Sequence, residues 1–144
     1  MTLMVLIGYH LLIMKLINRD VDYAVRALVF MARANKPTVS VVQMREQVGV
    51  SGPFLRKIMQ KLHKAGVVHA VKGKGGGFAM ARNPENITLK RLIEALQGPL
   101  KLNDCLFDHK LCRHHASCVL RHKIAGMESR LVAEAESVTV RDLL

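Results

Sequence analysis

The stretch from Ser40 to Met80 restricts the possible folds more than any other part of the chain, because signals that begin and end helices follow one another there at short intervals. Ser40 and Gln43 have the spacing of a capping box, in which each side chain satisfies a free backbone donor of the other residue. Gly49 follows as a C-terminal glycine would, and Ser51 is placed to cap a second helix. These residues predict two short helices separated by a tight turn.

The second of these helices is expected to have an apolar face and a basic face. Its large apolar residues recur at i, i+3, i+4 and i+7, which places them on one side of a helix: Leu55, Ile58, Met59 and Leu62. The opposite side carries Arg56, Lys57, Gln60, Lys61 and Lys64. Gly66 is expected to end the helix. One face can therefore pack against a core while the other presents cations to a partner.

A hairpin tipped with glycine is expected to follow this helix. Val67 to Val71 has the composition of a strand, residues 72–77 form a basic turn rich in glycine, and residues 78–80 can return as a second strand. Two helices, the second of them basic, followed by a basic hairpin make a winged helix-turn-helix. In that fold the second helix enters the major groove of DNA and the hairpin reaches the phosphates or the minor groove beside it. The expected fold class is therefore mainly α with a small β-hairpin.

The charge of the chain indicates the same kind of partner. Residues 47–84 contain seven Lys or Arg and no Asp or Glu, within a chain whose formal net charge is +11. A duplex nucleic acid is the simplest partner for such a surface, and a solvated basic face without a partner is the alternative. Aromatic residues make up only 4% of the chain, which argues against single-stranded RNA. The sequence shows no nucleophile–base constellation, acidic pair or phosphate loop, so we expect neither an enzyme nor a small-molecule substrate.

The expected DNA-binding domain spans residues 14–98. Asp20 is placed to cap its first helix, which runs from Val21 to about Ala34, and Thr88 is placed to cap its last helix, which ends at Gly98. Residues 1–13 are almost wholly apolar, but they are too short to span a bilayer and lack the basic start and cleavage site of a signal peptide. Because Met14-Lys15-Leu16 has the form of a second, more natural start, we expect an upstream extension or a weakly ordered arm here, in a cytoplasmic protein without membrane contact.

Residues 119–144 are expected to form a dimerisation helix and a C-terminal turn. Their apolar residues recur at spacings of four and three, as in the seam of a coiled coil: Leu120, Ile124, Met127, Leu131 and Ala135. Nothing obvious in the rest of the chain covers this seam. A second copy of the chain would cover it, and a twofold homodimer suits a palindromic operator in double-stranded DNA. The alternative is a helix that folds back on its own head.

Residues 99–118 are expected to form a metal-binding loop that contains Cys105, Cys112 and Cys118. Three cysteines within fourteen residues favour metal binding over a disulfide framework. In a helix, the first two would lie about 10 Å apart along the axis, too far to share a small centre, so binding requires a loop. Thiolates select zinc or iron–sulfur clusters, and the two-residue spacing of structural zinc sites is absent, which favours a cluster. Three unrelated thiols are the alternative.

Three thiolates leave one coordination position for a further ligand. The candidates near the loop are histidines, and the candidate from the first helix is an aspartate: His109, His114, His115, His122 and Asp22. An oxygen or nitrogen ligand binds a cluster iron less firmly than a thiolate does. Such a site is open to exchange, which suits a sensor. The residues themselves leave the choice among these ligands open.

These residues resemble the Rrf2 family of bacterial winged-helix regulators over about Met14 to Leu144. The resemblance is carried by the three-cysteine loop and by five segments: Asp22-Tyr-Ala-Val-Arg-Ala-Leu28, Val50-Ser-Gly-Pro-Phe-Leu-Arg-Lys-Ile58, Leu62-His-Lys-Ala-Gly-Val67, Val71-Lys-Gly-Lys-Gly-Gly-Gly77 and Thr139-Val-Arg-Asp-Leu-Leu144. It is strongest to the iron–sulfur members that sense nitric oxide or regulate cluster biogenesis. Those members are dimers whose DNA binding changes with the state of the cluster.

The resemblance implies a ligand set. The three cysteines fall on the family's cluster cysteines, although the first gap is one residue longer than usual. Asp22 falls where the nitric-oxide sensors place an aspartate that ligates the partner subunit's cluster. The biogenesis regulators use a histidine three residues after the last cysteine, a position held here by Arg121, with His122 one residue later. The resemblance therefore favours Asp22 and a 4Fe–4S cluster, with His122 as the alternative ligand and a 2Fe–2S cluster also possible.

The resemblance also implies the DNA contacts. It places Pro53, Arg56 and Lys57 at base-contacting positions and Lys72 at the wing position that approaches the minor groove. With their neighbours, the predicted DNA-contacting residues are Ser51, Pro53, Arg56, Lys57, Gln60, Lys61, Lys72 and Lys74. The expected function is that of a transcriptional repressor whose DNA affinity is controlled by an iron–sulfur cluster sensing nitric oxide, redox state or iron–sulfur status. The alternative is a winged-helix regulator whose cysteine loop holds zinc or acts as a thiol switch.

Overall fold

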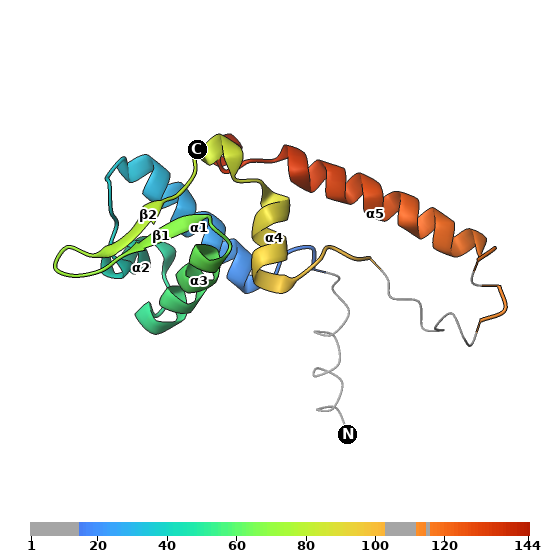
Figure 1. The fold of residues 1–144 in the computed structure, drawn as a ribbon, viewed down its shortest axis with the longest axis horizontal. Helices are drawn as coiled ribbons and strands as arrows, with labels where there is room; N and C mark the ends of the chain where they lie inside the picture. Colours follow the sequence, from blue (N-terminus) through green and yellow to red (C-terminus); the bar gives the residue numbers. More distant parts are fainter. Residues whose placement is uncertain (1–14, 103–111, 115) are drawn as a thin grey trace, which may run out of the picture.

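The computed structural model describes residues 15–102, 112–114 and 116–144. They form a mainly helical head that carries a two-stranded antiparallel sheet, and a long helix, α5 (Val119–Ser137), that extends away from the head (Figure 1). The fold class predicted from the sequence is confirmed. The expected extension of residues 1–13 lies outside the described part of the chain, as does Cys105. No helix within the described ranges is both long and apolar enough to cross a membrane.

The first helix, α1 (Arg19–Ala34), begins two residues earlier than the sequence predicts. The prediction that Asp20 caps this helix is wrong, because the side chain of Asn18 accepts the hydrogen bond from the backbone N–H of Val21 at 3.0 Å. The backbone N–H of Asn18 in turn donates to Oε1 of Gln97 at 2.9 Å. The apolar face buries Val21, Ala24, Ala27, Leu28 and Met31. Asp20 is therefore part of the first turn, and its carboxylate is available to another helix.

The helix-turn-helix forms where the sequence predicts it. In α2 (Val41–Val48) the capping box is complete, with Ser40 and Gln43 bonded to each other's backbone N–H at 3.2 and 3.0 Å. Gly49 ends α2 with a φ of 73°, in the left-handed region that favours glycine. Ser51 occupies the cap position of α3 (Gly52–Lys64), but its side chain makes no capping hydrogen bond. The predicted apolar stripe of α3 is buried, at Leu55, Ile58, Met59 and Leu62.

The predicted hairpin pairs β1 (Val68–Val71) with β2 (Gly77–Met80). A third segment, which the sequence did not indicate, joins it. Val39 and Phe78 exchange two backbone hydrogen bonds of 2.9 Å, so the residue just before the cap of α2 pairs with β2. Phe78 is buried against the core at the same point. The hairpin is therefore attached to the head by backbone pairing as well as by its connection to α3.

This attachment predicts that Gly77→Ala destabilises the head. A Cβ at Gly77 would lie 2.2 Å from the carbonyl oxygen of Val39 and 2.7 Å from its carbonyl carbon, and both are backbone atoms that the paired strands hold in place. We expect the free energy of unfolding to fall by about 2 kcal/mol or more, which is the typical destabilisation caused by a residue that its site cannot accommodate. Urea denaturation followed by circular dichroism measures it.

Gly126→Ala is the matched control for this substitution. A Cβ at Gly126 meets nothing within 4 Å, and the residue lies inside a helix. Alanine favours a helix by about 1 kcal/mol over glycine, so this variant is expected to be as stable as the wild type or more stable. Equal stability of the two alanine variants would contradict the pairing of Val39 with the wing.

Helix α4 (Leu89–Gln97) closes the head and receives the end of the chain. Thr88 caps this helix, as predicted. Its side chain accepts a hydrogen bond from the backbone N–H of Arg91. The backbone N–H of Leu89 donates to the carbonyl of Val138 at 2.8 Å, and that of Val140 donates to the carbonyl of Ile87 at 2.9 Å. These bonds join the residues that follow α5 to the segment that enters α4. The C-terminal end of α5 is therefore fixed to the head.

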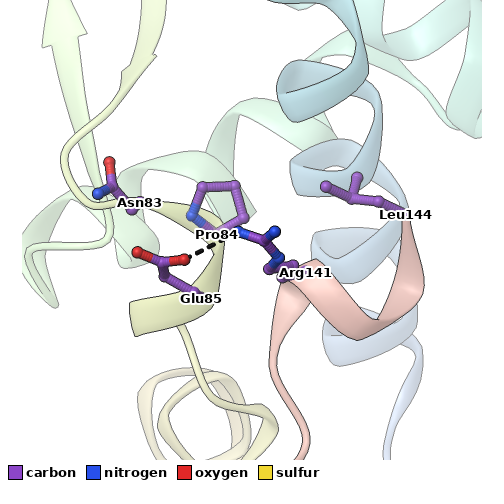
Figure 2. A pocket seen from close by; sticks show the side chains of 5 residues that line it. All are labelled: Asn83, Pro84, Glu85, Arg141 and Leu144. Carbon is purple, nitrogen blue, oxygen red and sulfur yellow. Dashed lines mark hydrogen bonds and ion pairs between the residues drawn. The ribbon is translucent and has the colours of Figure 1, made fainter.

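A short final helix, η3 (Val140–Leu143), completes this attachment, and Figure 2 shows the hollow beside it. Nη1 of Arg141 lies 2.9 Å from Oε2 of Glu85, which belongs to η2 (Pro84–Asn86). The hydroxyl and backbone N–H of Thr139 both donate to Asp142 at 2.7 Å, and these bonds hold the pKa of its carboxyl below its ordinary value. Thr139 thus caps the last turn, and the ion pair joins the chain end to the head.

The rest of α5 is only partly covered within the described chain, where the backbone N–H of Leu102 donates to Oε2 of Glu128 at 3.0 Å. Ala135 near its C-terminal end is buried, and Leu131 and Val132 pack against the core of the head. Toward the N-terminal end Leu120 is 68% exposed and Met127 is 54% exposed. Figure 1 shows the reason, since α5 projects beyond the head over most of its length. The C-terminal end of α5 therefore packs on its own head, as the alternative expects, whereas the exposed residues nearer its start remain available to a partner.

Candidate nucleic-acid interface

The basic face of α3 is presented to solvent. The buried stripe of this helix packs into the head, so the opposite side faces outward as the sequence predicts. All eight residues predicted to contact DNA are exposed: Ser51, Pro53, Arg56, Lys57, Gln60, Lys61, Lys72 and Lys74. No acidic residue lies between positions 47 and 84 to compensate these charges. A polyanion bound to this surface would neutralise its cations.

A hollow between α3, the start of α2 and the hairpin brings predicted residues together. Arg56 and Gln60 reach it from α3, and Lys72 reaches it from the turn of the hairpin. The remaining lining residues are Ser40, Val41, Val42, Ala70, Val71, Gly73, Gly76, Gly77 and Phe78. Val42 and Val71 are exposed large apolar residues beside these polar groups. The sequence does not indicate that these two valines are exposed, because a single valine in an apolar run carries no sign that it faces outward.

Lys61 differs from the other basic residues of α3. Its Nζ lies 3.1 Å from Oδ2 of Asp20 in the first turn of α1, so it is directed toward α1. The hollow beside the hairpin contains Arg56 and Gln60 but not Lys61. Two residues further along α1, Asp22 pairs with Arg26 of its own helix at 3.0 Å. The two aspartates of this turn therefore have different partners.

The C-terminal end of α3 is held by two arginines that the sequence analysis did not single out. Nη2 of Arg91 in α4 donates to the carbonyl oxygen of Ala65 at 2.7 Å. Nε of Arg82, which follows the hairpin, donates to the carbonyl oxygen of Gly66 at 3.1 Å. Carbonyls at a helix end lack partners within the helix, and cations interact favourably with them. The orientation of α3 therefore depends on α4 and on the segment after the hairpin.

Two of the three predicted cluster cysteines lie in the described part of the chain, as free thiols. Cys112 and Cys118 are both half-buried. Cys118 is the cap residue of α5, where its Sγ accepts from the backbone N–H of Arg121 at 3.5 Å. Nδ1 of His122 lies 2.9 Å from the carbonyl oxygen of Cys118. Within the described ranges no three Cys, His, Asp or Glu side chains come close enough to hold a metal ion.

The structure separates Asp22 from Cys118 in a single chain. Asp22 lies in the first turn of α1, in the head, whereas Cys118 lies at the end of α5 that is remote from the head (Figure 1). A helix of 19 residues is about 28 Å long. Asp22 of one chain therefore does not reach Cys118 of that chain. His122 lies one turn from Cys118 on the same helix.

The sequence matches a family of regulators over most of its length. The profile of the Rrf2 family, described as an iron-dependent transcriptional regulator, matches residues 17–144. The HTH-type transcriptional regulator NsrR of Bacillus subtilis is 29% identical over 133 residues, which cover 91% of this chain and 90% of that protein.

Solved structures have the same fold. The structure of IscR from T. potens superposes with a TM-score of 0.68 at 26% identity, covering 90% of this chain and 85% of that one. CymR, the global cysteine regulator of B. subtilis, superposes with a TM-score of 0.72 at 22% identity, covering 91% of this chain and 96% of that one. The head and α5 together are therefore an arrangement found in known regulators.

Proposed function

We propose a function from the fact that this chain belongs to the Rrf2 family of transcriptional regulators. The protein represses transcription in the cytoplasm, where it binds a palindromic operator as a homodimer. The observation that carries this proposal is the exposed basic face of α3 beside the hollow that it shares with the hairpin. In such a fold the second helix of the helix-turn-helix reads the major groove, and phosphate contacts beside it fix the register. We further propose that an iron–sulfur cluster controls the affinity for the operator.

The exposed part of α5 supports a homodimer. Its apolar residues form one row, and Leu120 and Met127 of that row are more than half exposed. A second copy of the same helix, related by a twofold axis, would cover the row in both chains. The same axis would set two α3 helices against two half-sites, about 34–36 Å apart, of a palindromic operator.

The donors that the structure describes fit a cluster. Cys112 and Cys118 are unpaired thiols, and Cys118 has the extended backbone of a cap residue, with φ of −70° and ψ of 109°. The two thiols therefore do not belong to one continuous helix, which is the condition that a shared centre requires. Cys105, Cys112 and Cys118 would hold the cluster. When bound, such a cluster supplies a centre that reacts with nitric oxide or changes its redox state.

The fourth ligand is proposed to come from the other subunit. The first turn of α1, which contains Asp22, lies in the head, and the start of α5, which Cys118 caps, lies far from the head in the same chain (Figure 1). In a dimer through α5, the start of that helix in one chain would lie beside the head of the other, where Asp22 of the partner subunit can complete the ligand set. His122 is the alternative, since it lies beside Cys118 in the same chain.

The proposed ligand set suggests how the cluster site and α3 are linked. A ligand can change DNA binding only if it binds the DNA-competent and incompetent states with different affinity. Asp22 would tie the first turn of α1 in one head to the start of α5 in the other chain. That tie would hold the spacing between the two α3 helices, and its loss would misplace them against the half-sites.

Anaerobic purification tests this proposal. We expect a brown protein with visible absorbance that binds its operator, and we expect nitric oxide to remove both properties.

Asp22→Ala is expected to lower cluster stability, measured as the half-life of the absorbance, and to uncouple operator affinity from the cluster. His122→Ala is the matched control and is expected to leave both unchanged. If Asp22→Ala kept both its cluster stability and its cluster-dependent DNA binding, Asp22 would not be the bridging ligand. A colourless wild-type protein that contains zinc would favour the alternative, a winged-helix regulator whose cysteine loop holds zinc.

A further inference from the structure

We infer that Asp20 is a positioning residue that holds Lys61 away from the DNA phosphates and so limits the affinity of the head for DNA. The inference deepens the proposed function and rests on it, because Lys61 lies on the helix proposed to enter the major groove. It concerns a contact between two residues that are 41 positions apart in sequence. The sequence alone does not indicate this contact, because it predicts Asp20 as a helix cap and Lys61 as a DNA contact.

The geometry of the contact shows which partner is fixed. Nζ of Lys61 lies 3.1 Å from Oδ2 of Asp20, as both a hydrogen bond and an ion pair. The Asp20 side chain is 26% exposed, whereas the Lys61 side chain is 49% exposed. Asp20 has a short side chain in a helical turn whose cap, Asn18, is bonded to Gln97 of α4. The carboxylate is therefore set by the fold of the head, and the long lysine side chain bends to reach it.

The other cations of α3 have no such partner within the described chain. Among these residues, Arg56, Lys57 and Lys64 form no ion pair. Asp20 reaches α3 from α1. Positions 47–84 contain no Asp or Glu, and Glu46 of α2 forms no ion pair with a described residue of α3. A single carboxylate therefore removes one cation from the set of basic residues on this face.

The consequence for binding follows from the competition between carboxylate and phosphate. A DNA phosphate that takes Lys61 must first replace Asp20, and the carboxylate that remains repels the same phosphate. Each phosphate contact that a protein makes adds about 0.9 to the slope of log affinity against log salt. A lysine that stays with Asp20 adds nothing to this slope. Asp20 would therefore lower both the affinity of the head and its salt dependence.

The test is a double-mutant cycle, measured by fluorescence anisotropy on a random-sequence duplex, so that no operator is required. Asp20→Asn is expected to raise affinity about five-fold at about 0.1 M salt and to steepen the salt slope by about 0.9 per head, the value for one added phosphate contact. Glu94→Gln removes one exposed carboxylate from α4 and is the charge-matched control, with an expected change below about two-fold. In a Lys61→Gln background, the gain from Asp20→Asn is expected to fall to the level of this control.

Two results would overturn the inference while leaving the proposed function intact. The first is that Asp20→Asn leaves the affinity for the duplex unchanged. The second is that it raises this affinity equally with and without Lys61, which would mean a general charge effect. Thermal unfolding of each variant separates these results from a loss of structure. A variant that unfolds at a lower temperature than the wild type would lose affinity for DNA, whereas Asp20→Asn is expected to gain affinity. A wild-type protein that binds no duplex at any salt concentration would overturn the inference and the proposed function together.

Discussion

Replacing both Leu120 and Met127 with glutamate is expected to convert the proposed dimer into monomers and to weaken operator binding by about 100-fold or more. The two side chains are 68% and 54% exposed on the part of α5 that is only partly covered in the described chain. Glutamate has nearly the same helix propensity as leucine and methionine, so the helix itself should persist. The two substitutions would place charges from both chains, without opposite charges to pair with, in an apolar interface.

The effect on operator binding comes from the loss of linkage between two heads. When one head of a dimer is bound, the other is held near its half-site at a high effective concentration, and a monomer loses this advantage. Binding of a random-sequence duplex is expected to fall much less, because single heads retain their phosphate contacts. Analytical ultracentrifugation measures the oligomeric state, and fluorescence anisotropy on operator and random duplexes measures the two affinities.

Ser129→Glu is the control for this prediction. Ser129 is exposed on α5, on the side of the helix opposite to the row of apolar residues. The substitution adds a charge to the same helix outside the proposed interface, so the dimer and its operator affinity are expected to persist. If the double variant remained a dimer with unchanged operator affinity, α5 would not be the interface.

The second large effect is expected from Arg56→Ala, which should reduce both operator affinity and sequence preference. Arg56 lies in the hollow between α3 and the hairpin, where its guanidinium can reach a base edge. A bidentate contact from arginine to guanine contributes about 1–3 kcal/mol of discrimination, and a dimer would lose this contact twice. We therefore expect at least about 30-fold weaker operator binding, with tolerance of other bases at one position of each half-site.

Lys72→Ala provides the contrast. Lys72 reaches the same hollow from the hairpin, but its ammonium group is expected to contact phosphate, so its loss should weaken all sequences alike and lower the salt slope by about one per head. The operator is first obtained by selection from a random duplex pool, and each base is then varied in competition assays. A uniform loss on all sequences for Arg56→Ala would show that Arg56 is a phosphate contact and does not read bases.

Local signals in the sequence predicted the parts of the fold that are closed within one turn of chain. The capping box of Ser40 and Gln43, the buried stripe of α3 and the cap of α4 at Thr88 all formed as expected. In each, the interacting groups are three or four residues apart, so their geometry follows from the helix itself. The turn of the hairpin is local in the same sense. The exposure of the predicted DNA-contacting residues followed from the stripe, because it leaves the opposite face outside.

The sequence was misleading where two local signals competed. Asn18 and Asp20 are both favourable cap residues, and the sequence alone gave no reason to prefer the first. The choice depends on Gln97, which binds the backbone of Asn18 from a helix 79 residues away. Once α1 begins at residue 19, Asp20 belongs to the helix and its carboxylate can turn to Lys61. A shift of two residues in a helix start thus decided the partner of a cation on the proposed DNA-binding face.

The sequence by itself determined the order of the elements, the buried and basic faces of α3 and the row of apolar residues on α5, because periodicity and capping act over one or two turns of chain. Only the tertiary structure decided that Arg91 holds the end of α3, that Val39 joins the hairpin, and that most of α5 stands clear of the head. These features require elements distant in sequence to be packed at one distance and angle. That packing is set by the whole core and not by any single segment.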